Sequence, residues 1–288
     1  MSIIASAKRP DNWLEIHRNI VTNLNIEFIF VGPNQPGFVL PYNFHFIQSK
    51  VKPVQCLEIA RRESKGNKIL FFADDLLFRD PFSVDRLVEF LDQSGNAFNI
   101  ASSRFIFNGV DLSNEAHLYD LSDPKSPVMP VGGIMLRDSL EAIGGIDSAF
   151  IGVCYDLDVA MRMYERGGKV FLTDVYIEES FSRRGNSFLF QDYHLHDRAV
   201  LDSLWVVDGR VTTKRSRPVF LFSDTNIKYR SQGPRGHWRG QGFLLVEYWE
   251  SRKYFIQKVI RSARIHFSKL KGKFGFSLIL HRSSSTSK

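Results

Sequence analysis

Three short apolar segments, separated by stretches with helical periodicity, place the strongest constraint on how this chain can fold. The segments are Ile-Ile-Ala-Ser-Ala at 3–7, Ile-Glu-Phe-Ile-Phe-Val at 26–31 and Lys-Ile-Leu-Phe-Phe-Ala at 68–73, and each is predicted to be a strand. Helices are predicted after them, over 11–23 with Asp11 as cap, over 53–64, and over 83–92 with Ser83 as cap. Strands that alternate with helices favour an α/β fold with a mostly parallel sheet flanked by helices.

The second half of the chain carries weaker patterns. It predicts, in order, a strand over 128–136 with Gly132-Gly133 inside it, a helix from 138 to Gly144-Gly145, a helix over 155–166 and a strand over 169–172. Residues 103–127 lack periodicity and suggest a substrate-facing insertion. The polar segment 182–241 suggests loops over a site.

Composition bounds the size of the core and the kind of partner. The 288 residues are 43% hydrophobic and 24% charged, which suits one substantial core and argues against disorder. Ten of the 38 basic residues follow Glu250, after which no acidic residue occurs, so the net charge of +7 belongs to the tail. We therefore expect one domain over 1–245 and a basic amphipathic extension over 246–288, and we do not expect nucleic acid as a partner.

The extension mixes its cations with apolar residues at roughly helical spacing, which suits binding to an anionic membrane surface. A helix packed on the domain with a solvated basic face is the alternative. The sequence shows no N-terminal signal and no apolar stretch near the ~20 residues that span a bilayer. The distant cysteines Cys56 and Cys154 fit buried thiols in a reducing compartment. We expect a cytoplasmic protein that can bind the inner face of the membrane.

Asp74 and Asp75 directly follow the third apolar segment. In an open α/β sheet, ligands lie beyond the carboxyl ends of the strands. Two adjacent carboxylates repel each other unless a positive charge compensates them, and a divalent cation bound to a diphosphate would do so. Mg²⁺ or Mn²⁺ there could stabilise a departing nucleoside diphosphate. The alternative is a solvated turn before the helix that begins near Ser83.

Asp156 and Asp158 fall in the first turn of the helix predicted over 155–166. The helix dipole favours acidic residues there, so capping is one interpretation. The other is that one carboxylate acts as a general base on a sugar hydroxyl. Arg162 lies four residues after Asp158 and can pair with it, which leaves Asp156 for chemistry.

Other candidates carry weaker signals. His194, in Tyr-His-Leu-His-Asp, is a possible metal ligand, as is His196, although loop histidines are commonly exposed. Arg183 and Arg184 suit a diphosphate clamp, because guanidinium groups match phosphate geometry. Cys154 is expected to be a small buried residue, since no histidine is near it in sequence. No glycine-rich nucleotide-binding fingerprint is present.

The order of the motifs resembles family 2 glycosyltransferases with a GT-A fold. The motifs are a first strand followed by Lys-Arg-Pro, then Ile-Leu-Phe-Phe-Ala-Asp-Asp-Leu, Val-Gly-Gly-Ile-Met-Leu-Arg, Ile-Gly-Gly-Ile-Asp and Tyr-Asp-Leu-Asp-Val-Ala-Met-Arg. The resemblance covers roughly residues 2–175. Each motif is weak alone, and their shared order carries the resemblance.

The resemblance implies roles for particular residues. Asp75 would ligate the metal with Asp74 near the ribose or diphosphate, His194 would be a further ligand, and Asp156 would be the catalytic base. Gly132 and Gly133 would let the backbone approach the donor sugar, because they lack a Cβ. The nucleotide pocket would be lined by residues of the first two strand ends and the following helix: Ala5, Ala7, Arg9, Gly32, Asn34, Lys52 and Gln55.

The expected activity is transfer of a sugar from a nucleoside diphosphate donor to a hydroxyl of a glycan or lipid-linked glycan, by inversion and with Mn²⁺ or Mg²⁺, as in polysaccharide biosynthesis. Three positions depart from the family pattern: Ala73 replaces the first Asp of the DxD motif, Tyr155 replaces a Glu, and the segment after 26–31 lacks an acidic residue. These departures leave open the alternative that the chain is a relative that binds nucleotide sugars without turnover. A nucleotidyltransferase is the other alternative.

Overall fold

The computed structural model describes residues 1–107, 109–111, 113, 130–179, 187–208 and 210–221, with the backbone alone for 187–195 and 210. The chain divides at Gly240, and all described residues belong to the first unit, Met1–Gly240. The extension predicted over 246–288 lies outside the described residues, so that domain division stays a prediction. Among the helices of the described segments, none has the length and apolar character needed to cross a membrane.

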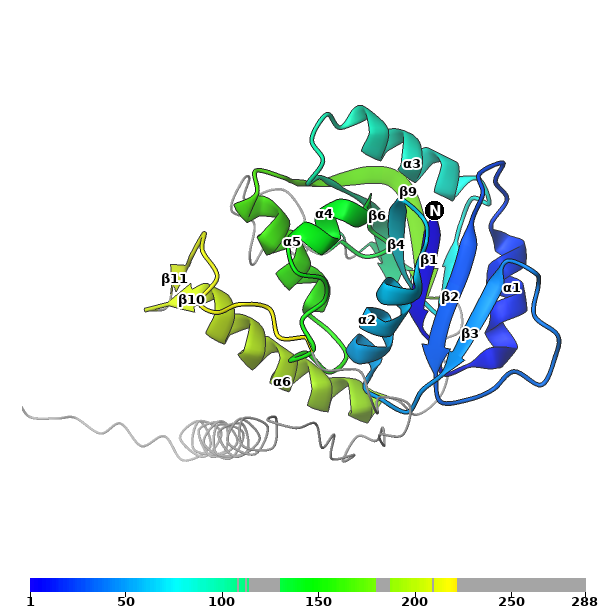
Figure 1. The fold of residues 1–288 in the computed structure, drawn as a ribbon, viewed down its shortest axis with the longest axis horizontal. Helices are drawn as coiled ribbons and strands as arrows, with labels where there is room; N and C mark the ends of the chain where they lie inside the picture. Colours follow the sequence, from blue (N-terminus) through cyan, green and yellow to red (C-terminus); the bar gives the residue numbers. More distant parts are fainter. Residues whose placement is uncertain (108, 112, 114–129, 180–186, 209, 222–288) are drawn as a thin grey trace, which may run out of the picture. The chain divides into compact units, whose positions relative to one another are not determined.

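The first unit is built on one large mixed sheet (Figure 1). Its strands are β1 (Ser2–Ser6), β2 (Glu27–Gly32), β3 (Phe44–Gln48), β4 (Lys68–Ala73), β5 (Leu76–Phe78), β6 (Ile100–Phe107), β7 (Val110–Asp111), β8 (Ile134–Leu136) and β9 (Val170–Glu179). The order is β3-β2-β1-β4-β8-β6-β9-β5, with β7 beside β6. Strands β3, β2, β1 and β4 are parallel, whereas β8 runs antiparallel between β4 and β6. A short separate hairpin joins β10 (Val206–Val207) to β11 (Arg210–Val211).

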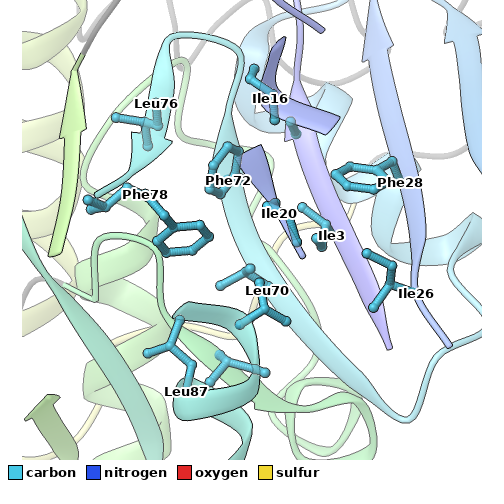
Figure 2. Close-up of a cluster of buried hydrophobic side chains, with 14 of the residues drawn as sticks. Ile3, Ile16, Ile20, Ile26, Phe28, Leu70, Phe72, Leu76, Phe78 and Leu87 are labelled. Carbon is cyan, nitrogen blue, oxygen red and sulfur yellow. The ribbon is translucent and has the colours of Figure 1, made fainter. Parts of the chain in front are cut away.

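Alternate side chains of the central strands face two different helical layers. The helices are η1 (Pro10–Asn12), α1 (Trp13–Asn19), α2 (Pro53–Glu63), α3 (Ser83–Gln93), α4 (Arg137–Ala142), α5 (Tyr155–Glu165) and α6 (Ser187–Trp205). On one face, Ile3, Leu70 and Phe72 form a core with Ile16 of α1 and Leu87 of α3 (Figure 2). On the other face, α2 packs against β1 and β2, and Phe71 of β4 meets Tyr155 of α5. Both faces are therefore covered, as the continuous apolar strands predict.

An aromatic cluster fills the β2–β3 end of the sheet. The indole of Trp13 lies 5.6 Å from the ring of Phe30, 5.8 Å from Phe44 and 5.0 Å from Phe46, measured between ring centroids. Phe44 also stacks on Phe28 at 5.2 Å. Part of the chain's 25 phenylalanines therefore serves packing. Strand β3, which carries Phe44 and Phe46, was missed in the sequence because its half-buried pattern is short and irregular.

Several predicted boundaries and caps need correction. Asp11 lies in η1 and does not cap α1, which ends at Asn19 instead of continuing to 23. Ser83 is the first residue of α3, where its hydroxyl donates to the carbonyl of Asp80 at 2.6 Å, so it is not the cap. Strand β9 runs to Glu179, well past the predicted end at 172, because it pairs with both β6 and β5.

The prediction of loops throughout 182–241 is wrong for α6. This helix of 19 residues is followed by the β10–β11 hairpin. Its buried residues Asp197, Val200, Leu201 and Leu204 follow helical spacing, but the frequent polar residues around them hide the pattern. Residues 180–186, with Arg183 and Arg184, lie outside the described residues, so their role stays a prediction.

Gly32 allows the ends of β1 and β2 to approach each other. The Ala7 amide donates to the Val31 carbonyl at 2.8 Å, and a Cβ at position 32 would lie 1.5 Å from the Ala7 carbonyl oxygen. Because that oxygen belongs to the backbone, any side chain at position 32 must displace a strand end.

We expect Gly32→Ala to lower the free energy of unfolding by at least about 2 kcal/mol, as overpacking of rigid backbone does. Gly37→Ala is the matched control, because a Cβ there meets no atom within 4 Å. Chemical denaturation of both variants measures the difference. Equal stability of Gly32→Ala and the wild type would contradict the close approach of the two strand ends.

Candidate active site

The ends of β1, β2 and β4 bring the segments that follow them to one edge of the sheet. Ser6 is in register with Val31 of β2 and with Ala73 of β4. Because these strands are parallel, their carboxyl ends meet at the same edge. Asn34 lies beside the first loop, where its side-chain amide donates to the Lys8 carbonyl at 2.7 Å. The predicted pocket segments after β1 and β2 therefore adjoin the acidic pair after β4.

Asp74 binds the loop that follows β1. Its Oδ2 accepts the backbone N–H groups of Lys8 and Arg9, and its Oδ1 accepts the Arg9 guanidinium at 2.7 Å. The Asn12 side chain donates to its carbonyl oxygen at 2.7 Å. Only 4% of Asp74 is exposed. Burial raises the pKa of the Asp74 carboxyl, although Arg9 and the two N–H groups oppose the shift.

Arg9 connects Asp74 to Asp75 and lies near Glu179. The same Nη1 of Arg9 donates to Asp75 Oδ2 at 2.7 Å. Glu179 is in register with Leu76 across the β5–β9 pair, which places it next to the acidic pair. Burial, and the charge of Asp75, raise the pKa of Glu179. Burial lowers the pKa of the Arg9 guanidinium, but the carboxylates outweigh it and hold the value above normal.

Arg9 therefore supplies one of the positive charges that Asp74 and Asp75 require, which the sequence led us to expect from a divalent cation. Asp74 is engaged by the protein, which leaves partly exposed Asp75 and half-buried Glu179 to face a ligand. Two carboxylates fit a divalent cation that completes its shell with phosphate oxygens. Within the described residues no three His, Cys, Asp or Glu side chains gather as a site made by protein alone. The side chain of His194 lies outside the described residues.

Other predicted pocket residues have structural partners of their own. Ala5 and Ala7 are buried members of the hydrophobic core, so they present almost no surface to a ligand. Gln55 is 1% exposed, and its Oε1 accepts the Lys52 backbone N–H at 3.2 Å at the start of α2. Contact of Lys52 and Gln55 with a nucleotide base stays a prediction.

The pair Gly132-Gly133 precedes β8 and is not inside the strand, which corrects the predicted boundary. Gly132 adopts φ +55°, a left-handed conformation that glycine tolerates. A Cβ on Gly133 would lie 2.7 Å from the Pro130 carbonyl oxygen, and the Gly133 carbonyl accepts the Phe71 N–H at 3.0 Å. The turn itself therefore requires glycine, and contact with a donor sugar stays a prediction.

Asp156 lies in the first turn of α5, next to the strand that ends at the acidic pair. The neighbouring Tyr155 ring packs on Phe71 of β4, with 5.7 Å between ring centroids. Asp156 Oδ1 accepts the N–H of Leu157 at 2.9 Å. Loss of solvation raises the pKa of Asp156 to about 6. Loss of solvation also raises the pKa of the Cys154 thiol to about 12, as suits the buried thiol expected there.

Asp158 points into a buried ionic network. Its carboxylate accepts Arg162 Nε, Arg215 Nε and Trp205 Nε1, each at 2.9 Å. Arg215 also binds Asp147. Although burial raises the pKa of Asp158, the two guanidinium groups outweigh it and lower the value. The predicted pair of Asp158 with Arg162 is confirmed. Asp158 therefore stabilises the fold, whereas Asp156 is partly exposed.

No protein family model and no characterised protein matches this sequence. Among the solved structures that share its fold are two with TM-scores of at least 0.50. TarS from S. aureus, residues 1–349, has a TM-score of 0.50 and 12% identity, covering 72% of this chain and 66% of that chain. The mannosyltransferase PcManGT from Pyrobaculum calidifontis has a TM-score of 0.52 and 13% identity, covering 73% of this chain and 65% of that chain.

Both structures are glycosyltransferases, and this chain spans just under two thirds of the length of each. The predicted GT-A-like fold is confirmed. At such low identity the likeness establishes the fold alone.

We expect Asp158→Asn to destabilise the protein by about 3 kcal/mol or more, because it removes the carboxylate charge that pairs with the buried guanidinium groups of Arg162 and Arg215. Asp208→Asn, on an exposed turn with φ +51° that asparagine tolerates, is the control and should change stability by less than about 0.5 kcal/mol. Thermal and urea unfolding at neutral pH compare the two. A loss no larger than that of the control would show that the network contributes little.

Proposed function

We propose that this chain is a glycosyltransferase that moves a sugar from a nucleoside diphosphate donor to a hydroxyl acceptor. The observation that carries the proposal is the grouping of Arg9, Asp74, Asp75 and Glu179 at the carboxyl edge of a glycosyltransferase fold. PcManGT, which shares this fold, was solved with GDP-Man and Mn²⁺. The same class of donor suits an edge that carries a guanidinium beside the partly exposed carboxylates of Asp75 and Glu179.

Arg9 and Lys8 would bind the diphosphate. Arg9 uses Nη1 for Asp74 and Asp75, and within the described part of the chain Nε and Nη2 make no hydrogen bond. Those N–H groups form a planar fork that matches two phosphate oxygens. Lys8 is exposed beside it and adds a second cation. Asp74 would hold this loop in place by accepting two of its backbone N–H groups.

Asp75 and Glu179 would hold a divalent cation against the diphosphate. When bound, such a cation neutralises the negative charge that develops on the departing nucleoside diphosphate. The charge balance supports this assignment, because among the described residues the edge carries three carboxylates against the two cations Lys8 and Arg9. A diphosphate adds further negative charge, so binding without another cation would be unfavourable.

Asp156 would be the general base. A pKa of about 6 leaves its carboxylate charged at neutral pH and still basic enough to accept a proton. The acceptor oxygen attacks the anomeric carbon and its proton passes to Asp156, while the bond from that carbon to the diphosphate oxygen breaks. Attack opposite the leaving group inverts the anomeric configuration. The acceptor we propose is a glycan or lipid-linked glycan, which the basic extension over 246–288 would help to reach at an anionic membrane surface.

We expect the protein to bind a UDP- or GDP-sugar more tightly with Mn²⁺ than with EDTA, and Asp75→Asn to remove that difference. Asp156→Asn should keep donor binding but lose at least about 100-fold in transfer or donor hydrolysis, as loss of a general base does. Calorimetry measures binding, and nucleoside diphosphate release measures turnover.

Asp208→Asn is the surface control and should behave as the wild type. If no nucleotide sugar binds in the presence of Mn²⁺, the glycosyltransferase proposal fails. Binding without turnover in the wild type would favour a binding protein that lacks activity, and release of pyrophosphate from a nucleoside triphosphate would favour a nucleotidyltransferase.

The pH dependence should report Asp156. Because the carboxyl must be ionised to accept a proton, and burial raises its pKa to about 6, kcat should fall as pH decreases through about 6. An ordinary aspartate would lose activity only near pH 4. Rates between pH 4.5 and 8 at saturating substrates measure the midpoint. A flat profile down to pH 5 would contradict Asp156 as a desolvated base.

A further inference from the structure

The segment between α4 and α5 is irregular and yet largely buried. Residues 146–154 form neither helix nor strand, while Asp147 and Phe150 are fully buried and Ile151 and Cys154 nearly so. A buried backbone outside helices and strands needs other hydrogen-bond acceptors for its N–H groups. This segment leads directly into the first turn of α5, which carries Asp156.

Asp197 of α6 supplies those partners for residues 151–153. Its Oδ1 accepts the N–H of Ile151 at 2.9 Å, and its Oδ2 accepts the N–H groups of Gly152 and Val153, each at 2.8 Å. His196 Nδ1 contacts Oδ1 at 2.8 Å. Asp197 itself is 0% exposed. Three successive backbone N–H groups thus converge on one buried carboxylate, as they do around bound anions.

The same segment is held from its other side by α2. The Val54 N–H, in the first turn of α2, donates to the Ile151 carbonyl at 3.1 Å. At the end of the segment, Cys154 adopts φ +62°, a left-handed conformation that is strained for a non-glycine residue and persists only where its surroundings impose it. That conformation turns the chain into α5, two residues before Asp156.

We propose that Asp197 is the positioning residue for Asp156. By fixing 151–153, its carboxylate imposes the left-handed turn at Cys154 and so sets the direction in which α5 begins. Asp197 is buried and acts only through the backbone that precedes the base. The inference rests on the proposed function of Asp156.

A carboxylate suits this task better than an amide. An ionised Asp has two acceptor oxygens and no donor, which matches three N–H groups and a histidine nitrogen. Asparagine offers one oxygen and an NH₂ group, so Asp197→Asn leaves at least one buried N–H facing another donor. A base displaced by about 1 Å loses on the order of 100-fold in rate.

The test compares Asp197→Asn with Asp202→Asn, the same chemical change on the same helix at a side chain that pairs with Arg198 near the surface. We expect Asp197→Asn to lower kcat by 10- to 100-fold, to leave the donor Kd within twofold, and to move the acidic midpoint of the pH profile. Asp202→Asn should change none of these. Unchanged kcat and midpoint in Asp197→Asn overturn the proposal.

Two further variants separate positioning from general damage. Cys154→Gly, which adopts the left-handed turn without strain, should restore part of the kcat of Asp197→Asn. Asp156→Asn combined with Asp197→Asn should be no slower than Asp156→Asn alone, because a positioning residue has nothing left to position. Losses that multiply, or the absence of rescue, overturn the proposal. If Asp197→Asn does not fold, Asp197→Glu, which moves both oxygens by one methylene, is measured against the same outcomes.

A failure of the proposed function is distinct from these outcomes. It would leave Asp156→Asn as active as the wild type, whatever Asp197→Asn does.

Discussion

The ion pair of Arg9 with Asp74 and Asp75 is the interaction on which the carboxyl edge of the sheet depends. A nearly buried carboxylate such as Asp74 is unfavourable unless hydrogen bonds and an opposite charge replace the lost water. Arg9 and the N–H groups of the loop after β1 do so across 65 residues of sequence. Because the same guanidinium also binds Asp75, the loops after β1 and β4 are held as one surface. A ligand at this edge would contact a loop after β1 that is already ordered, which lowers the entropy cost of binding.

Buried acidic residues organise the other half of the candidate site in the same way. Glu58 of α2 accepts the Ile146 N–H at 3.1 Å and also pairs with Arg61. Asp158 accepts hydrogen bonds from two guanidinium groups and an indole, and Asp197 accepts hydrogen bonds from three backbone N–H groups. Each group is buried and each is matched by donors, so the irregular chain around α5 is fixed without a strand ladder. This arrangement separates acidic residues that hold the fold from Asp156, whose pKa burial raises toward neutrality.

The two halves of the candidate site, the carboxyl edge of the sheet and the chain around α5, meet at β4. Phe71 receives the ring of Tyr155 from α5 and donates its N–H to Gly133, three residues before Asp74. Tyr155, which departs from the family pattern, therefore has a packing role that a charged glutamate could not fill. Tyr155 at this position packs α5 against the sheet, and the carboxylate of Asp156 stays in the first turn of the helix.

Features that depend on local pattern could be predicted from the sequence: the strands β1, β2 and β4, the helices α2 and α5, and the pair of Asp158 with Arg162, whose i,i+4 spacing any helix brings together. The groups that surround the candidate site could be identified only in the folded chain. Glu179 reaches Asp75 through the pairing of β5 with β9, which are far apart in sequence. Asp197 reaches the segment before α5 from a helix whose periodicity is obscured by polar residues. Such contacts depend on strand register and helix docking, which are set by the packing of the whole core and leave no signal in any single stretch of sequence.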